Sequence, residues 1–327
     1  MTPRMQEATK RVLRLTAVVG SLFLATVAGP AQSTSKREIT GDKSRAAQSS
    51  SQRLIEAQRQ LVLVDERIAR LSVEDAARLT SFVVGNLYFV MVHELGHAVI
   101  SQLNLPVLGQ EEDAADSFAT LSMLFIGTEL SHTVLRETAR GLWLTAQRDK
   151  SADQLPAMYD EHGLDVQRAY QIVCLMVGSD PKTFRDVAAI AKMPPERQET
   201  CGSDFEQAAD SWGSLLDDRS SVASKSRSFK RSSTRKGSTD IRSQLRVKYD
   251  EPDSRPGYRS VLKAAGVLER VAKFAQENLS LPRPMTIKAM KCDEPNAYWD
   301  DREREVVVCF ELVGEFIELG LRAPTDK

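Results

Sequence analysis

The pentapeptide His-Glu-Leu-Gly-His at residues 93–97 constrains this chain more than any other feature of its sequence. Residues four apart lie on one face of a helix, so His93 and His97 can aim their imidazoles at one point. Two neutral imidazoles placed in this way suit Zn²⁺. Glu94 lies about 100° round the helix from His93, too far to share the ion. It can instead hold a water molecule that the metal activates and take its proton.

A catalytic zinc ion takes three protein ligands and leaves one position open. Glu112 is the expected third ligand, because a break at residues 104–109 lets a second helix return toward the motif. Asp116 lies one helical turn after Glu112 and is expected to accept the free N–H of a ligating histidine. Glu111 and Asp113 are alternatives to Glu112, but only Glu112 is paired with Asp116 at one turn.

The residues before the motif favour a buried helix at an active site. Residues 81–92 form an almost continuous apolar run that leads into His93. The alternative is a chance match, in which a buried helix carries two histidines that are satisfied by ordinary hydrogen bonds. The apolar context and the downstream carboxylates together favour the metal site.

At these residues the chain resembles the gluzincin metallopeptidases, the thermolysin-like zinc proteases. In that group the glutamate of a downstream Glu-x-x-Ala-Asp pattern is the third ligand and the aspartate braces a histidine. The chain is still more similar to a bacterial family of metallopeptidases whose physiological role is unknown. The resemblance implies zinc and peptide hydrolysis, but no particular substrate. It covers roughly residues 80–212 and 281–320, in the stretches NLYF, HELGHAVI, LPVLGQEEDAADSFA, EHGLDVQRAYQIVCLMVGSDP and CDEPNAYWDDREREVVVCFEL.

Zinc proteases usually need a hydrogen-bond donor for the oxyanion that forms during hydrolysis. His162 is the leading candidate for this catalytic role, and its alternative is a surface or helix-capping histidine. Tyr159 and Tyr298 compete for the same role. His132 lies in a polar stretch and is expected to be non-catalytic.

The N-terminus has the pattern of a secretory signal peptide. Basic residues precede an apolar stretch from Leu15 to Ala28, which is followed by small residues. The pattern predicts export to the bacterial periplasm or beyond, without stable membrane insertion after cleavage. Retention of this segment as an uncleaved membrane anchor is the minor alternative, although it is shorter than the roughly 20 apolar residues of a spanning helix.

The four cysteines agree with export, because an even number in an exported chain suggests disulfides. Three pairings are possible. The pairs Cys174–Cys201 and Cys292–Cys309 are favoured, since each is local in sequence. A zinc site made of cysteines is disfavoured because the chain has no Cys-x-x-Cys.

Composition and patterning divide the 327 residues into five segments. We expect a signal peptide at 1–31, a disordered leader at 32–50, a helical metallopeptidase lobe at 51–216, a basic Ser- and Arg-rich flexible linker at 217–248, and a C-terminal lobe of helix and strand at 249–327.

The expected fold class is α+β and predominantly helical, with a zincin-like core. Residues 305–310 form the best strand in the sequence, because they are apolar and β-branched. Together with residues 296–298 they resemble the strand unit that lies over the cleft in related zincins, where it precedes the HExxH helix. Here it follows the helix, which suggests a permuted arrangement folded back over the site.

The expected function is zinc-dependent hydrolysis of peptide bonds in a peptide or protein substrate. Two alternatives remain: a catalytically silent zincin-like periplasmic binding protein, and an amidase that acts on cell-wall peptides. The formal net charge of −1 argues against nucleic acid as a partner. The sequence predicts neither the specificity nor the oligomeric state.

Overall fold

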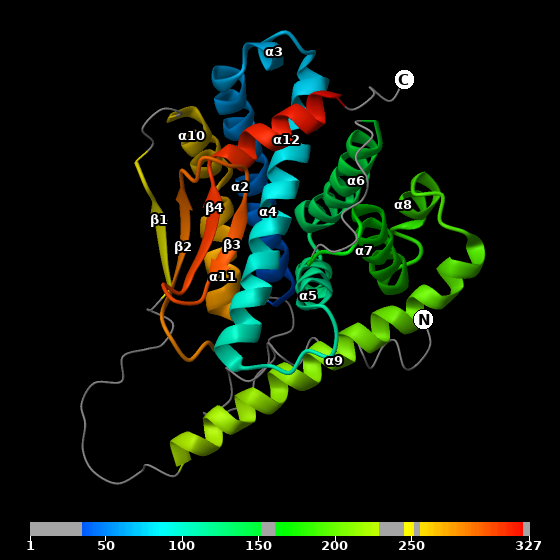
Figure 1. The fold of residues 1–327 in the computed structure, drawn as a ribbon, viewed down its shortest axis with the longest axis vertical. Helices are drawn as coiled ribbons and strands as arrows, with labels where there is room; N and C mark the ends of the chain where they lie inside the picture. The colour runs from blue at the N-terminus through cyan, green and yellow to red at the C-terminus, as the bar shows by residue number, and fades with distance from the viewer. Residues whose placement is uncertain (1–34, 152–160, 229–244, 252–255, 323–327) are drawn as a thin grey trace.

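The computed structural model describes residues 35–151, 161–228, 245–251 and 256–322 (Figure 1). The predicted signal peptide and Tyr159 lie outside the described residues. The helices are α2 (Ser35–Val64), α3 (Glu66–Ala69), α4 (Val73–Leu103), α5 (Glu111–Ile126), α6 (Glu129–Ser151), α7 (Asp165–Ser179), α8 (Arg185–Ile190), α9 (Pro195–Ser228), α10 (Pro256–Ala265), α11 (Val267–Asn278) and α12 (Glu311–Arg322). The strands are β1 (Leu245–Tyr249), β2 (Met285–Met290), β3 (Ala297–Asp300) and β4 (Glu305–Cys309).

The four strands form one small mixed sheet in the order β1-β2-β4-β3. β1 and β2 are parallel, as are β2 and β4, whereas β3 runs antiparallel to β4. Val306, Val307 and Val308 of β4 are buried, as expected for an inner strand that is covered on both faces. The molecule is therefore mostly helical with a small sheet near the C-terminus, which confirms the coarse fold prediction.

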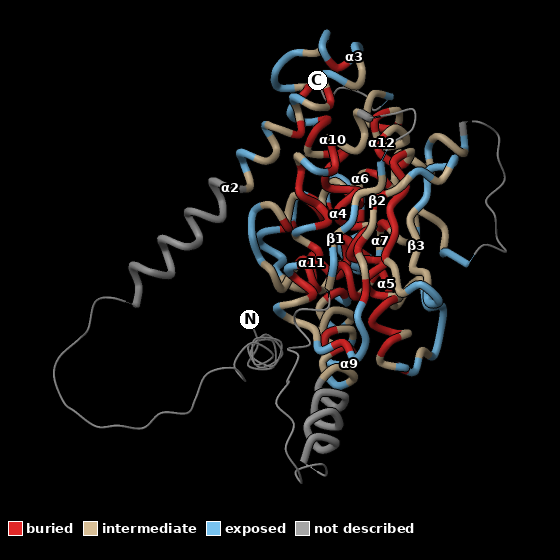
Figure 2. The backbone as a smooth tube through the Cα atoms, turned by 90° about the vertical axis from the view of Figure 1, so that its left-hand side faces the viewer, coloured by how far each residue is buried: buried red, intermediate tan, exposed pale blue. Residues whose placement is uncertain are grey.

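Helix α4 is the central element of the fold. It lies between the sheet and the helices α5, α6 and α7, and the buried residues in Figure 2 gather around it. Ser72 caps its first turn, because the Ser72 hydroxyl accepts the backbone N–H of Asp75 at 3.0 Å. The helix ends at Asn104, whose φ of 49° is left-handed, a conformation that asparagine tolerates. Among the described residues, α4 alone is long and apolar enough to cross a membrane, but most of its apolar stretch is buried inside the protein.

The predicted lobes share one hydrophobic core. Leu95 of α4, Met176 of α7 and Val308 of β4 belong to the same buried cluster. The structure also differs from three predicted boundaries. Helix α2 begins at Ser35, within the predicted leader, while α9 extends to Ser228 and β1 begins at Leu245, both within the predicted linker. β1 pairs with β2, which lies forty residues further along the chain, and composition does not reveal such a pairing.

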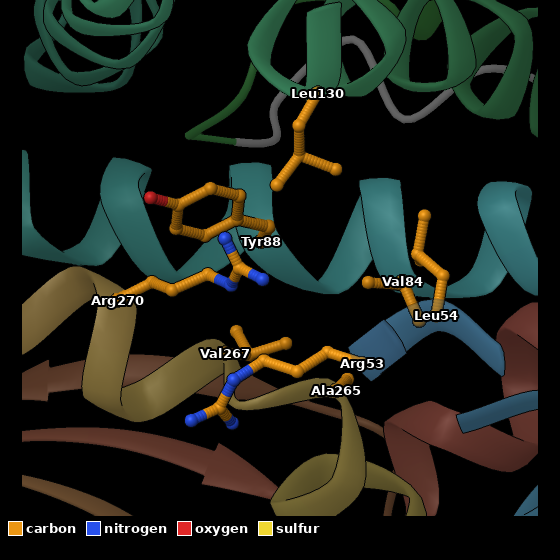
Figure 3. Close-up of a pocket in the computed structure, with 8 residues that line it drawn as sticks. All are labelled: Arg53, Leu54, Val84, Tyr88, Leu130, Ala265, Val267 and Arg270. Carbon is orange, nitrogen blue, oxygen red and sulfur yellow. The ribbon is translucent and has the colours of Figure 1, made fainter. Parts of the chain in front are cut away.

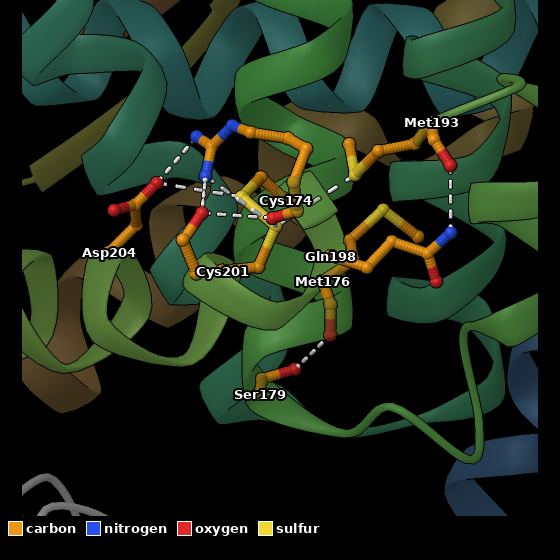
Figure 4. The surroundings of a disulfide bond; sticks show 9 residues. Cys174, Met176, Ser179, Met193, Gln198, Cys201 and Asp204 are labelled. Carbon is orange, nitrogen blue, oxygen red and sulfur yellow. Dashed lines mark hydrogen bonds and ion pairs between the residues drawn. A yellow bond between two sulfur atoms is a disulfide. The ribbon is translucent and has the colours of Figure 1, made fainter. Parts of the chain in front are cut away.

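Two disulfides join the pairs that are local in sequence, Cys174–Cys201 and Cys292–Cys309, as predicted. The first connects α7 to α9, with Met193 and Asp204 beside it (Figure 4). Gly178 permits this close packing, because a Cβ there would lie 2.1 Å from the carbonyl oxygen of Cys201. The second disulfide ties the end of β4 to the loop before β3.

A small cavity lies against the side of α4 that carries Val84 and Tyr88 (Figure 3). Arg53 of α2 and Arg270 of α11 approach it from below α4 in that view. Its volume of about 10 Å³ is room for one water molecule. The cavity is therefore too small for a peptide.

Candidate metal centre

Helix α4 places the three residues of the HExxH motif as the helical period requires. His93 and Glu94 are 4% and 8% exposed, and the imidazole rings of His93 and His97 lie 4.9 Å apart between centroids. Their Nε2 atoms are 3.2 Å apart. The two imidazoles therefore converge, as their spacing of four residues predicts.

Helix α5 returns across α4 and brings Glu112 to the same point. The close approach depends on Gly96, because a Cβ at that position would lie 3.2 Å from the Cα of Ala115. Glu112 Oε2 lies 3.0 Å from His93 Nε2, and Oε1 lies 3.4 Å from His97 Nε2. The structure thus brings together the three residues that the sequence predicts as ligands.

His162 joins the same cluster from the irregular stretch that precedes α7. Its Nε2 lies 2.9 Å from Glu112 Oε2, and its ring stacks on that of His93 with 6.1 Å between centroids. Ligand atoms of His93, Glu112 and His162 all lie within 4.8 Å of one another. Two overlapping sets of three donors therefore share His93 and Glu112, and they differ in whether His97 or His162 is the third.

These spacings fit a single metal ion. Bonds of about 2.1 Å in a tetrahedral zinc site place neighbouring donor atoms about 3.4 Å apart. The four donor separations given above, from 2.9 to 3.4 Å, are close to that value. Burial acts to raise the pKa of Glu112, but hydrogen bonds to the three imidazoles outweigh it and hold the pKa well below its usual value. Glu112 is therefore ionised, as a metal ligand must be.

Carboxylates behind the cluster orient the histidines. Asp116 Oδ1 lies 2.8 Å from Nδ1 of His93, and Glu111 Oε1 lies 2.9 Å from Nδ1 of His97. Both contacts leave the Nε2 atoms to face the centre. Asp116 was expected here from its spacing. The sequence suggests Glu111 only as an alternative ligand. In the structure it instead contacts Nδ1 of His97, the ring nitrogen that faces away from the centre.

Arg168 of α7 completes this support and was not identified from the sequence. Its Nε and Nη2 donate to the two oxygens of Asp116 at 2.7 and 2.9 Å. Burial acts to raise the pKa of Asp116, but hydrogen bonds to His93 and Arg168 overcome it and lower the pKa to about 2. Fifty-two residues separate Arg168 from Asp116, so no local spacing could have revealed the pair.

Glu94 lies on the wall of the cleft beside the donors. Burial raises its pKa above the usual value, although the neighbouring histidines act in the opposite direction. A carboxyl group with a raised pKa is suited to accept and release a proton near neutral pH. Glu94 therefore lies beside the donors and is more easily protonated than an exposed glutamate.

The donors open into a cleft of about 700 Å³. β3 forms one wall, and β3 has a strand partner only on its β4 side among the described strands. Tyr298 and Trp299 of β3 line the cleft. His132 instead packs against Phe184, away from the cleft. The cleft is lined by Phe89, Val90, His93, Glu94, His97, Glu111, Glu112, Glu161, His162, Arg168, Pro295, Asn296, Ala297, Tyr298, Trp299 and Leu312.

Donors that converge in a cleft define a candidate metal centre, and comparison with known families agrees. Residues 51–216 and 249–326 match the DUF4344 family, which is described as "Putative metallopeptidase". The chain belongs to this family. The matched ranges contain every donor described above as well as β3. No curated protein and no solved structure matches the chain.

Proposed function

We propose that this protein is an exported zinc metallopeptidase that hydrolyses peptide bonds with an activated water molecule. The observation that carries the proposal is the convergence of His93, His97 and Glu112 at donor separations of 3.0 to 3.4 Å. Two imidazoles and one carboxylate are a ligand set of catalytic zinc sites. Zinc, when bound, supplies a Lewis acid that polarises the scissile carbonyl and lowers the pKa of water.

Glu94 is the proposed general base. Its carboxylate takes a proton from the attacking water and then passes the proton to the leaving amine. The HExxH motif suggests this role for Glu94, because Glu94 follows His93 directly in the sequence but lies about 100° round the helix from it. The raised pKa of Glu94 supports the second half of the cycle, in which the protonated acid must be stable enough to form.

β3 is the proposed docking edge for the substrate backbone. An extended peptide can add to the open edge of a sheet, and its main-chain hydrogen bonds then align it along the strand. β3 lies beside α4 on the cleft wall, so an added peptide would pass the donors. The strand unit follows the HExxH helix in the chain, which supports the permuted zincin-like arrangement as part of this proposal.

Two side chains in the cleft, His162 and Tyr298, are the candidates for the hydrogen-bond donor to the oxyanion. The sequence favours His162. In the structure its Nε2 contacts Glu112 at 2.9 Å, so donation to a substrate requires that this contact be broken.

Export rests on the signal-like N-terminal pattern, and the two disulfides are consistent with a protein outside the cytoplasm.

The test compares Glu94→Gln with Glu161→Gln, a matched change in a second cleft carboxylate. Each protein is loaded with zinc, its metal content is measured, and a peptide library is digested. We expect the wild type and both variants to bind one zinc ion per chain. Only Glu94→Gln should cleave peptides at least 100-fold more slowly than the wild type. Zinc binding without cleavage by the wild type would instead favour a binding protein. Cleavage of purified cell wall alone would favour the amidase.

A further inference from the structure

The Cys292–Cys309 disulfide lies at the base of one wall of the cleft. Cys309 is the last residue of β4, and Cys292 lies in the loop between β2 and β3. The consecutive residues 295–299, which follow Cys292 and include most of β3, line the cleft. The disulfide therefore ties down the stretch of chain that forms this wall, residues 292–300, which we call the wall segment.

The wall segment has little buried surface of its own. None of its residues is buried, and those from 293 to 296 are exposed. Its strand, β3, pairs only with β4 among the described strands, and β3 is the edge of the sheet. Segments with few buried contacts open locally at a low cost in free energy. The position of this wall therefore depends on what fastens its loop.

Hydrogen bonds fasten the loop beside the disulfide. The Glu311 carboxylate accepts the backbone N–H groups of Cys292 at 3.2 Å and Asp293 at 3.3 Å. The carbonyl oxygen of Asn296 accepts the backbone N–H of Cys309 at 2.9 Å. Water can replace such bonds at an exposed loop with little net change in free energy. The disulfide is the covalent connection between this loop and the buried strand β4.

The two disulfides differ in their access to a reductant. Cys174 and Cys201 are 1% and 0% exposed, where α7 packs on α9. Cys309 is also 0% exposed, but its partner Cys292 is partly exposed and has exposed residues on both sides. Thiol–disulfide exchange requires a thiolate to reach one of the two sulfurs. In the folded protein a reductant can therefore attack the second disulfide, through Cys292, but not the first.

We propose that the Cys292–Cys309 disulfide is a redox switch for the cleft, and that its reduction by a dithiol loosens the wall segment and weakens peptide binding. One thiolate of the dithiol attacks the sulfur of Cys292 and displaces that of Cys309. The second thiolate then displaces Cys292 from the mixed disulfide. The protein gains two electrons, two protons and hence two thiols, while the dithiol becomes a disulfide.

The switch acts on the peptide and leaves the metal in place. His93 and His97 lie on α4 and Glu112 lies on α5, so none of the proposed ligands belongs to the wall segment. A looser wall must be ordered again when a peptide binds, and that ordering costs part of the binding free energy. The inference rests on the proposed function and adds regulation of the same cleft.

Reduced thioredoxin, a dithiol protein, is the probe for the zinc-loaded wild type. Alkylation and mass spectrometry of one aliquot identify the reduced cysteines, and KM, kcat and zinc content are measured on another. We expect thiols at Cys292 and Cys309 only, unchanged zinc content and kcat, and a KM that rises about threefold or more. Reoxidation with oxidised glutathione should restore the KM.

The double variant Cys292→Ser with Cys309→Ser keeps the size of both side chains and cannot form the bond. Its KM should equal that of the reduced wild type and should not respond to thioredoxin. An intact Cys292–Cys309 bond after treatment, equal reduction of both disulfides, or reduced wild type with an unchanged KM would each overturn the inference. Loss of zinc on reduction would overturn it as well.

Hydrogen exchange measured by mass spectrometry reports on the wall segment directly and needs no turnover. Its backbone amides should exchange about tenfold faster or more in the reduced wild type, while those of α4 should be unchanged. Equal exchange in the two forms would contradict the inference. Faster exchange in a protein that cleaves no peptide would leave the redox-sensitive wall standing and remove the proposed function. Peptide cleavage with a KM and an exchange rate that ignore reduction would do the reverse.

Discussion

Asp116 accepts a hydrogen bond from Nδ1 of His93 at 2.8 Å, and through this contact a buried ion pair controls the orientation of a proposed metal ligand. Arg168 holds both oxygens of the same carboxylate. Asp116 is 3% exposed, so the group has little freedom to rearrange. The imidazole of His93 is thereby fixed with Nε2 toward the centre of the cleft.

Asp116→Asn should lower zinc affinity about 10- to 100-fold, since contacts of this kind to a ligating histidine have that effect. An amide can still contact Nδ1, but it carries no charge and pairs poorly with Arg168. Competition with a fluorescent zinc chelator measures the change. Asp113→Asn is the control, because Asp113 lies three residues before Asp116 on α5 and makes none of the histidine contacts described above. Equal affinities for Asp116→Asn and the wild type would contradict this role.

Stability of the metal-free protein should depend on the protonation of His93. Burial opposes the charged imidazole, but hydrogen bonds to Asp116 and Glu112 outweigh burial and raise the pKa to about 9. The unfolded value is about 6.5, so the folded state binds the proton more tightly. The resulting stability is fully present below about pH 6.5 and is lost as the pH rises through about 9.

Urea unfolding of chelator-treated protein should therefore show a loss on the order of 3 kcal/mol between about pH 6 and about pH 10. The zinc-loaded protein should lack this contribution, because a ligating imidazole carries no proton at Nε2. Asp116→Asn should have a smaller dependence in the metal-free form. Metal-free wild type with equal stability at both ends of this range would contradict the assignment.

Gly178→Ala should destabilise the packing of α7 against α9. The added methyl would lie 2.1 Å from the backbone oxygen of Cys201, and backbone cannot move aside as a side chain can. We expect a loss of roughly 1–3 kcal/mol or more in the free energy of unfolding. Gly202→Ala is the control on α9, where a Cβ meets nothing within 4 Å. It should be neutral or stabilising by up to about 1 kcal/mol, because alanine favours a helix.

Removal of the Cys292–Cys309 disulfide should lower stability by about 3 kcal/mol, as expected for a loop closed over 17 residues. The double variant Cys292→Ala with Cys309→Ala tests this by chemical unfolding. Its stability in the presence and absence of reductant should differ only by the contribution of the other disulfide. A double variant as stable as the wild type under oxidising conditions would show that this bond does not constrain the unfolded chain.

The parts of the site that follow helical spacing could be predicted from the sequence. His93 and His97 share a face because they are four residues apart, and Asp116 follows Glu112 at one turn on a helix that crosses α4. The strand at Glu305–Cys309 was recognisable from its β-branched residues. Each of these signals depends only on nearby residues in the chain.

The remaining features depend on contacts between distant segments. Arg168 contacts Asp116 only because α7 packs on α5, and no sequence pattern near either residue indicates this pair. β1 pairs with β2, forty residues further along, so composition placed it in a linker. The position of His162 beside Glu112 also depends on contacts between distant segments. Sequence suggested a functional histidine there, but its distance to the donors requires the fold.

Zinc content is the most direct measure of the central claim that His93, His97 and Glu112 hold one ion. Wild type, Glu112→Gln and Glu111→Gln are loaded with zinc, passed through gel filtration and analysed for metal. The adjacent glutamates form a matched pair, because Glu112 faces the donors while Glu111 only supports His97. We predict one zinc per chain in the wild type and in Glu111→Gln, and almost none in Glu112→Gln. One tightly held zinc per chain in Glu112→Gln would contradict the account.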